Sequence, residues 1–324
     1  MSEIPATDER PLTQLIRAVG VHSFGGLESM VYEGVLRPLP GEGQVLVRVK
    51  AAGVGPWDAW VRAGKNALPQ PLPLILGSDL AGVVEEVGPG VFSFYPGDEI
   101  FGVTNSQFTG AYAEYALAEA AMIAPKPKRL SEVEAASVPV VASTAWQMVF
   151  EHGQVDGTKR VLVHGAAGNV GAYAVQLSRR AGAEVIATAF ARDVDYVRSL
   201  GADHVIDAQA LCFEERVKDV DVVIDTVGGE TLDRSFEVLK PGGVLVSSVA
   251  LPDQVKAARR RVRGVFFLVA VTTEGLSKIA DFFDSGQLTA NVGEVLPLAR
   301  ARLAHEMLAG KPHKRGKIVL AVDA

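Results

Sequence analysis

A glycine-rich turn between two short apolar runs is the clearest chemical signal in this chain. The run Val161–His164 is followed at once by Gly165-Ala-Ala-Gly-Asn-Val-Gly171, an amphipathic stretch and a second apolar run, Glu184–Thr188. Glycines let a pyrophosphate approach the backbone, and the start of the helix presents unpaired N–H groups to its oxygens. Within about 30 residues this arrangement predicts a dinucleotide site. We expect the phosphates to be held by Gly165, Ala166, Gly168, Asn169, Val170 and Gly171.

The end of the second run indicates which dinucleotide binds. Proteins that bind NAD usually place Asp or Glu there, whereas this chain has Ala189-Phe-Ala-Arg192. Ala189 carries no charge to repel a 2′-phosphate, and the guanidinium of Arg192 is close enough to pair with one. Such a charge-assisted hydrogen bond contributes about 1.5–3 kcal/mol, so the sequence favours NADPH. A second interpretation stays open, in which Arg192 pairs with the neighbouring Asp193 or Asp195.

The composition is that of an ordinary globular protein large enough for two domains. The 324 residues are 48% hydrophobic and 22% charged with a net charge of −6, so no positive field favours nucleic acid or an anionic membrane. The one cysteine, Cys212, excludes an internal disulfide and fits a reducing cytoplasm. No apolar run reaches the ~20 residues of a membrane span. We expect residues 1–13 to form a loose tail.

The elements that must position the glycine turn fall into two classes. The first third of the chain predicts a compact β-barrel, because short runs are separated by Gly and Pro turns. The runs are Leu15–Val21, Gln44–Ala52, Leu80–Val87, Glu99–Val103 and Gly110–Leu117. From residue 131 onward, helical stretches alternate with apolar strands, which predicts a parallel sheet covered on both faces. Its strands are Val161–His164, Glu184–Thr188, His204–Ile206, Val222–Asp225, Val244–Ser248 and Phe266–Val271.

The last run, Lys317–Val322, is expected to return to the barrel after a helix at Glu274–Asp284. We therefore expect one domain at residues 14–138 and 275–324 and a nucleotide domain at 139–274.

Several motifs resemble those of the zinc-independent medium-chain dehydrogenase/reductase superfamily, most closely its quinone oxidoreductase (zeta-crystallin-like) branch. They include Gly53-Val-Gly-Pro-Trp-Asp58, Gly77-Ser-Asp-Leu-Ala-Gly-Val-Val-Glu85, Gly110-Ala-Tyr-Ala-Glu-Tyr115, the turn ending at Gly171, Leu200-Gly-Ala-Asp-His-Val-Ile-Asp207, Asp225-Thr-Val-Gly-Gly229, Lys240-Pro-Gly-Gly243 and Gly316-Lys-Ile-Val319. The resemblance implies an α/β protein in which a GroES-like β-barrel domain is split around a Rossmann domain. The cofactor would lie in the cleft between them.

The resemblance also bears on metal binding. Zinc-dependent relatives carry Cys and a His-Glu pair at positions that match Gly55 and Ser78-Asp79. Gly55 has no side chain, and a serine is a poor zinc ligand. The six histidines are dispersed and a single cysteine cannot build a four-cysteine lobe. We therefore expect no metal.

Without a Lewis acid, the chemistry that fits is direct hydride transfer to quinones or α,β-unsaturated carbonyls. We expect Asp58, Arg62 and Asp79 at the floor of the cleft, with Trp57 and Trp60 on its walls. Structural alternatives stay open, since Asp79 also suits a loop tie and Arg62 also suits an ion pair with Asp58 or Asp79.

The resemblance also suggests cofactor contacts outside the glycine turn. It implies that Thr144 contacts the nicotinamide. Thr226 and Val227 follow the fourth strand of the sheet at its carboxyl edge, where ligands bind in open α/β folds. We expect both to contact the cofactor.

The sequence thus predicts an NADPH-dependent oxidoreductase, cytoplasmic and homodimeric through the apolar sixth strand. Two alternatives remain. One is a non-catalytic NADPH-binding protein, either a sensor or a crystallin-like component. The other is an enoyl-thioester reductase, which is weakened because Lys65-Asn66 stands where such enzymes carry a tyrosine.

Overall fold

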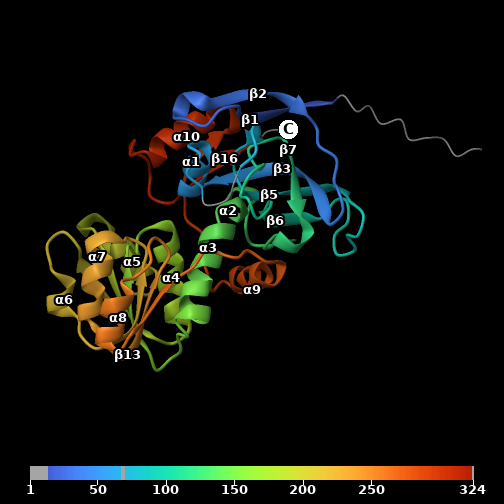
Figure 1. Ribbon diagram of the computed structural model, residues 1–324. Helices are drawn as coiled ribbons and strands as arrows, with labels where there is room; N and C mark the ends of the chain where they lie inside the picture. Colours follow the sequence, from blue (N-terminus) through green and yellow to red (C-terminus); the bar gives the residue numbers. More distant parts are fainter. Residues whose placement is uncertain (1–13, 67–69, 323–324) are drawn as a thin grey trace, which may run out of the picture.

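The structure is a computed structural model that describes residues 14–66 and 70–322. Figure 1 shows a β-barrel above a parallel sheet flanked by helices, which confirms the expected fold class. The predicted tail at residues 1–13 lies outside the described residues. Among the described helices, none is both long and apolar enough to cross a bilayer.

The barrel is built from both ends of the chain. Its main sheet has the order β15-β16-β3-β5-β6-β8, with β7 also paired to β3, and a small sheet has the order β2-β1-β4. The bounds are β1 (Leu15–Val21), β2 (Met30–Leu36), β3 (Gln44–Val54), β4 (Leu74–Ile75), β5 (Asp79–Val87), β6 (Glu99–Val103), β7 (Tyr115–Glu119), β8 (Ile123–Pro125), β15 (Val292–Pro297) and β16 (Lys317–Ala321).

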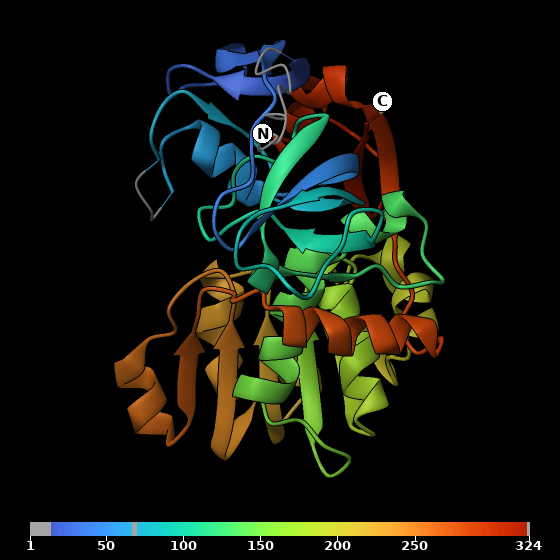
Figure 2. The same ribbon diagram turned by 90° about the vertical axis from the view of Figure 1, so that its right-hand side faces the viewer.

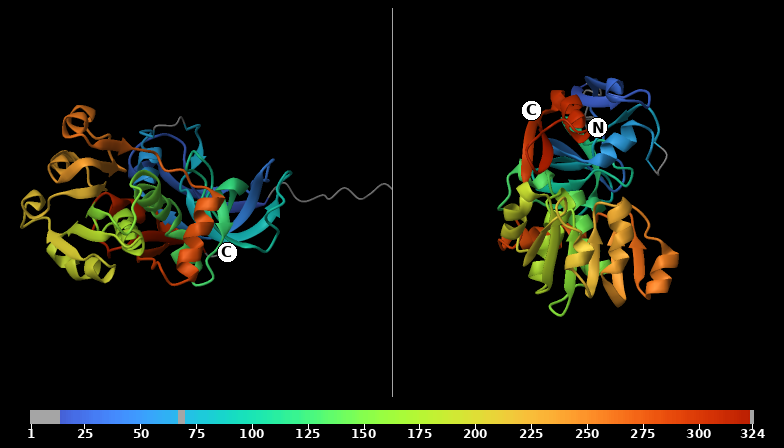
Figure 3. Two further views of the ribbon diagram at one scale, coloured as in Figure 1. Left: turned by 90° about the horizontal axis from the view of Figure 1, so that it is seen from below. Right: turned by 90° about the vertical axis from the view of Figure 1, so that its left-hand side faces the viewer.

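Alternation along β3 decides which face enters the barrel. Val45, Val47 and Val49 are fully buried, whereas Arg48 and Lys50 are half-buried. The return of the chain end is confirmed, because β16 pairs antiparallel with β3. The right-hand view of Figure 3 shows the red C-terminal segment in the same upper part of the molecule as the blue N-terminal strands.

The six-stranded sheet has the order β11-β10-β9-β12-β13-β14, and every neighbouring pair is parallel. The strands are β9 (Arg160–His164), β10 (Glu184–Ala189), β11 (His204–Asp207), β12 (Val220–Asp225), β13 (Leu239–Ser247) and β14 (Arg263–Phe266). All six residues of the central strand β12 are buried, as expected for a strand covered on both faces.

Ten helices accompany these strands in the described ranges. They are α1 (Pro56–Arg62), α2 (Glu132–Ala136), α3 (Pro139–Trp146), α4 (Asn169–Arg180), α5 (Val194–Ser199), α6 (Phe213–Arg216), α7 (Gly229–Arg234), α8 (Gln254–Arg260), α9 (Thr273–Asp284) and α10 (Ala301–Leu308). In Figure 2, α9 runs crosswise between the barrel and the sheet. Shorter helical turns include a π-type turn, Gln147–His152, that continues α3.

Three strands differ from their expected bounds by more than two residues. Strand β13 begins at Leu239, five residues before the expected Val244. The sixth strand ends at Phe266, because the chain then leaves the sheet and Ala270 exchanges two hydrogen bonds with the side chain of Gln147. The strand expected at Gly110–Leu117 begins only at Tyr115. Tyr112 precedes it and bridges the backbone of Val19 and Leu76 instead.

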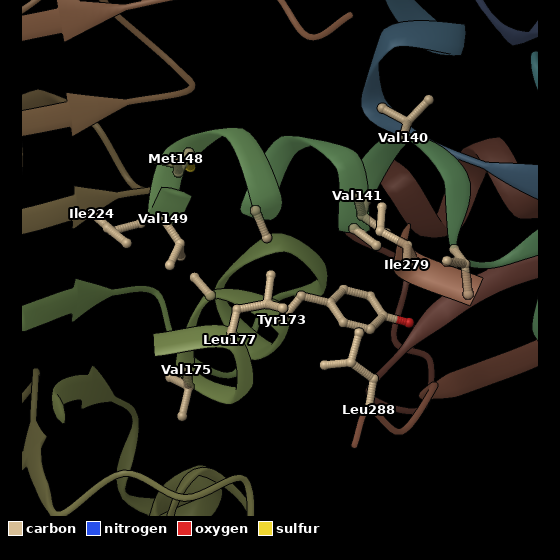
Figure 4. Packing of buried hydrophobic residues seen from close by; sticks show 14 of the residues in the cluster. Val140, Val141, Met148, Val149, Tyr173, Val175, Leu177, Ile224, Ile279 and Leu288 are labelled. Atoms are coloured by element: carbon tan, nitrogen blue, oxygen red, sulfur yellow. The ribbon is translucent and has the colours of Figure 1, made fainter. Parts of the chain in front are cut away.

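One hydrophobic core joins the two parts of the molecule. Figure 4 shows Val141 of α3, Tyr173 of α4, Ile279 of α9 and Leu288 packed together. The same core includes barrel residues such as Phe101, which is fully buried. Because interiors of this kind are close-packed, the core fixes how the cleft side of the barrel meets the sheet.

Candidate active site

The glycine turn folds as its sequence predicts. Gly165 has φ +70°, a conformation that favours glycine, and the N–H of Gly168 donates to its carbonyl oxygen at 2.9 Å. A Cβ on Gly171 would lie 2.3 Å from that same oxygen, so α4 can start this close to β9 only with glycine there. The start of α4, from Asn169, therefore faces the carboxyl edge of the sheet with its first N–H groups.

A cleft of about 1060 Å³ opens at this edge. It contains seven of the predicted cofactor residues: Gly165, Gly168, Asn169, Ala189, Arg192, Thr226 and Val227. Ala166 and Gly171 do not line it. Ala166 is fully buried, and Gly171 packs against the carbonyl oxygen of Gly165. Val170 packs against the core, and the Thr144 hydroxyl donates to the Val140 carbonyl at 2.7 Å within α3.

Asp225 holds the loop that carries Thr226 and Val227. Its buried carboxylate accepts hydrogen bonds from the N–H groups of Val227 and Gly228 and from the Ser247 hydroxyl. The Thr226 hydroxyl donates to the His164 carbonyl at 2.8 Å. The loop thus lies rigidly beside the glycine turn, with the Val227 side chain 53% exposed toward the cleft.

The far end of the cleft carries positive charge. The Arg192 side chain is 80% exposed and lies 3.6 Å from the Asp193 carboxylate, whereas Arg315 binds that carboxylate more closely, at 2.5 and 2.7 Å. The other acid beside it, Asp195, pairs with Arg198 at 3.3 Å. The two carboxylates that the sequence offered as partners for Arg192 are therefore held mainly by other arginines.

Sequence reasoning missed Arg315 at this end of the cleft. It lines the cleft together with His313 and Arg234. Arg315 stands just before Gly316-Lys317 in a motif that the sequence did identify, but only the return of the chain between α10 and β16 places it beside the end of β10. No local pattern signals that neighbourhood.

The carboxylate of Asp58 lies inside the barrel. Asp58 is fully buried, and its Oδ2 accepts hydrogen bonds from the Gly55 N–H at 2.8 Å and the Tyr112 hydroxyl at 2.9 Å. Burial raises the pKa of Asp58 to about 7, although the hydrogen bond from Gly55 and the charge of Lys317 oppose that rise. Asp58 anchors the start of α1 rather than facing the cofactor cleft.

The structural alternative in which Arg62 pairs with Asp58 or Asp79 is wrong. Its Nη1 lies 2.8 Å from Nδ1 of His305 and 3.9 Å from the Met30 sulfur. Burial, and then the charge of Arg62, lowers the pKa of His305 to about 3, so the imidazole is neutral and accepts from the guanidinium. The one-turn spacing of Arg62 from Asp58 directs it toward α10, which the sequence alone could not place.

Asp79 ties three segments together. Its Oδ2 lies 3.0 Å from Nζ of Lys317 on β16, and its Oδ1 accepts the Val140 N–H at the start of α3. Both charged side chains are buried, and burial raises the pKa of Asp79 against the opposing charge of Lys317. These contacts favour the structural alternative for Asp79 and bring in Lys317, to which the sequence assigned no role.

Trp57 fills the space beside Gly55 and Ser78. Its indole N–H donates to the Ser78 hydroxyl at 3.0 Å, and the Lys317 ammonium lies 4.2 Å from the centre of its ring. Trp60, in contrast, is 55% exposed. Among the described residues, no three or more His, Cys, Asp or Glu side chains form a group that could hold a metal ion.

Known proteins match the whole of this arrangement. Residues 41–128 match the model for the alcohol dehydrogenase GroES-like domain, and residues 200–320 match the model named zinc-binding dehydrogenase. The chain is 31% identical to the quinone oxidoreductase of Sus scrofa over 95% of this chain and 98% of that one. It is 33% identical to the 2-haloacrylate reductase of a Burkholderia species over 96% and 100%. The solved quinone oxidoreductase of Coxiella burnetii superposes with a TM-score of 0.88 at 30% identity, covering 96% and 100%.

Proposed function

Because this chain belongs to the medium-chain dehydrogenase/reductase superfamily of oxidoreductases, in its quinone oxidoreductase branch, we propose that it uses NADPH to reduce quinones or α,β-unsaturated carbonyls. The relatives named for quinones and for 2-haloacrylate support an activated acceptor of this kind. The nicotinamide, when bound, supplies the hydride. The chain supplies the binding surface, the orientation and the exclusion of water.

The observation that carries the choice of NADPH is the charge at the far end of the cleft. Arg192 and Arg315 both line it, and the neighbouring Asp193 is bound by Arg315. The uncharged Ala189 stands where a carboxylate would hold the ribose of NAD. A 2′-phosphate placed there gains charge-assisted hydrogen bonds instead of meeting an acid.

The rest of the cleft suits the remainder of a dinucleotide. The N–H groups at the start of α4 face the pyrophosphate position, with Gly165 and Gly168 allowing close approach. Asp225 keeps the loop at Thr226 in place. We propose that Thr144 contacts the nicotinamide once its hydroxyl exchanges its bond to Val140 for one to the ring amide.

The residues beside Gly55 support acceptors that need no Lewis acid. Neither Gly55 nor Ser78 is a metal ligand, and Asp79 is already paired with Lys317. Quinones and enones accept a hydride under these conditions because the resulting anion is delocalised. Since neither Asp58 nor Arg62 lines the cleft, we propose that solvent supplies the proton.

The direct test follows NADPH oxidation at 340 nm under anaerobic conditions. We expect turnover with 1,4-benzoquinone, 9,10-phenanthrenequinone or a 2-alkenal, and a lower KM for NADPH than for NADH. Absence of turnover with every acceptor would overturn the proposed activity. Arg315→Ala tests the preference for NADPH, because it exposes the Asp193 carboxylate to the 2′-phosphate. We expect it to reduce the difference between the KM for NADH and the KM for NADPH.

One observation favours the alternative of a non-catalytic NADPH-binding protein. Asp79, expected as a catalytic group, has both oxygens engaged in structural contacts. Tight NADPH binding by calorimetry without turnover over the same acceptor panel would establish that alternative.

We also propose the assembly and the domain limits that the sequence suggests. Strand β14 is the outer strand of the six-stranded sheet, and Phe266, Leu268 and Leu251 expose 38%, 71% and 64% of their surfaces near it. An apolar edge of this kind supports a homodimer. A monomer in light scattering at micromolar concentration would contradict it.

The sheet memberships support domain limits at 14–138 with 275–324 and at 139–274. The single cysteine supports a cytoplasmic location.

A further inference from the structure

We propose that Trp57 determines the width of the acceptor pocket by filling, with its indole, the space that a side chain on residue 55 would occupy. The acceptor pocket in this proposal rests on the proposed function. The filling of the space beside Gly55 by the indole rests on packing alone.

The backbone of residue 55 gives no reason for glycine. Gly55 has φ −132° and ψ 162°, an extended conformation that every amino acid adopts without strain. The reason lies in its surroundings. A Cβ built on Gly55 would stand 2.3 to 2.5 Å from three atoms of the Trp57 ring, and no other atom is as near. The position of the Trp57 ring therefore requires a residue without a side chain at position 55.

The ring itself is held from several directions. Its N–H donates to Ser78 at 3.0 Å, and the ammonium of Lys317 lies 4.2 Å from its centre. Lys317 is fixed in turn by its ion pair with Asp79. An indole with a hydrogen-bonded N–H and a cation beside its ring has little freedom to swing away, so it forms a rigid wall.

The position of this wall relative to the nucleotide site follows from Lys317. Lys317 lines a small cavity together with Gly168 and Asn169 at the start of α4. Trp57 is partly exposed and packs against the core that joins the barrel to the sheet. Lys317 therefore links the indole, on the barrel side, to the turn that we propose for the pyrophosphate, and we place the acceptor beside the indole.

Two consequences distinguish this wall from an ordinary buried tryptophan. On this proposal the indole limits the width of the acceptor pocket, so a smaller side chain at position 57 admits a wider acceptor. The same indole also excludes any larger side chain at position 55, including one that would bind a metal.

The packing is tested by a double-mutant cycle on the full chain. Gly55→Ala should lower the Tm of the wild type, because the new methyl group meets the ring. In the Trp57→Val background the same change should leave the Tm unchanged or raise it, because alanine restricts the unfolded chain in an allowed conformation. Trp60→Val is the matched control, because Trp60 lies on the same helix, is 55% exposed and contributes none of the three atoms nearest to a Cβ on Gly55, and Gly55→Ala should remain destabilising there.

An equal loss of Tm from Gly55→Ala in all three backgrounds would overturn the proposal. If Gly55→Ala alone fails to fold, recovery of a folded protein with Trp57→Val supports it, and failure in both backgrounds overturns it. If Trp57→Val does not fold, Trp57→Phe replaces it, and the loss from Gly55→Ala should then be smaller than in the wild type.

The functional arm compares a wide and a narrow acceptor with NADPH as donor. Trp57→Val should raise the ratio of kcat/KM for 9,10-phenanthrenequinone to that for 1,4-benzoquinone by about tenfold or more, as removal of a pocket wall does. An unchanged ratio overturns the role in acceptor width while the Tm cycle still reports the packing. A wild type inactive with both quinones instead overturns the proposed function and the acceptor-width claim with it.

Discussion

The barrel and the nucleotide cleft use ionisable side chains in opposite ways. In the barrel, Asp58 and Asp79 are fully buried, and their hydrogen bonds and ion pair join distant segments of the chain. In the cleft, Arg192 is 80% exposed and only loosely paired. Motif reasoning assigned catalysis to the buried carboxylates, yet their partners show that charge in the barrel maintains shape, whereas we propose that charge in the cleft binds the ligand.

We expect the largest effect from removing one partner of the buried ion pair in the barrel. Lys317→Met leaves the Asp79 carboxylate buried without its cation, which should lower the free energy of unfolding by about 3–5 kcal/mol in urea denaturation. Adding Asp79→Asn should recover much of that loss, because no buried charge then remains. A loss below about 1 kcal/mol for Lys317→Met would mean that the pair does not hold the barrel together.

The next effect concerns the pH dependence of stability. Because the pKa of Asp58 is about 7 in the folded protein against an ordinary 3.8, the folded state holds a proton that the unfolded state releases between these values. The contribution of Asp58 therefore favours folding at low pH and is lost as pH rises through this window, by on the order of a few kcal/mol.

Asp58→Asn should remove that dependence, since asparagine does not titrate and still accepts from Tyr112. Urea unfolding at several pH values between 4.5 and 7.5 measures it. Parallel curves for wild type and variant would show that Asp58 is not the titrating group.

The exposed side of the comparison is tested by Arg192→Ala. Loss of a charge-assisted hydrogen bond should raise the Kd for NADPH by about ten- to a hundredfold and leave the Kd for NADH nearly unchanged, as measured by calorimetry. Arg198→Ala is the control, an exposed arginine paired with Asp195 that should change neither Kd. An equal rise in the Kd for NADPH and for NADH in Arg192→Ala would show that Arg192 does not bind the 2′-phosphate.

The smallest effect sharpens the boundary between the two regions. Arg62 binds a neutral histidine, so Arg62→Met should reduce the free energy of unfolding by only about 1 kcal/mol and leave kcat/KM with quinones within a few-fold of wild type. A selective fall in kcat with unchanged stability would return Arg62 to the catalytic group in which its sequence motif placed it.

Local patterns in the sequence were enough to predict most of the helices and strands and the part of the site at the glycine turn. The glycine turn, the alternating valines of β3 and the alternation of strand and helix after residue 160 are decided within a few residues of each other. The periodicities of strand and helix therefore revealed most strands of both sheets, although they gave the wrong bounds for β7, β13 and β14 and did not identify β2, β4 or β8. Seven predicted cofactor residues line one cleft for the same reason.

The rest of the site depends on contacts that are distant in the chain. Lys317 meets Asp79 across 238 positions, and Arg62 meets His305 across 243. The pairing of Gly55 with Trp57 is close in sequence, but it follows from the direction of one side chain, which no pattern of residue types specifies. Sequence motifs identified Asp58 and Asp79 as important without showing that their partners make them structural.

The position of β16 constrains the order in which the protein can be completed during synthesis. The strands of the parallel sheet all lie within residues 160–266, so that sheet can form while the residues after Phe266 are still to be added. The barrel has no such independence, because β3 must wait for a partner that is translated almost 270 residues later. We therefore expect a chain that stops before Lys317 to have a complete parallel sheet and an open barrel, whose strand β3 lacks its partner β16 along one edge.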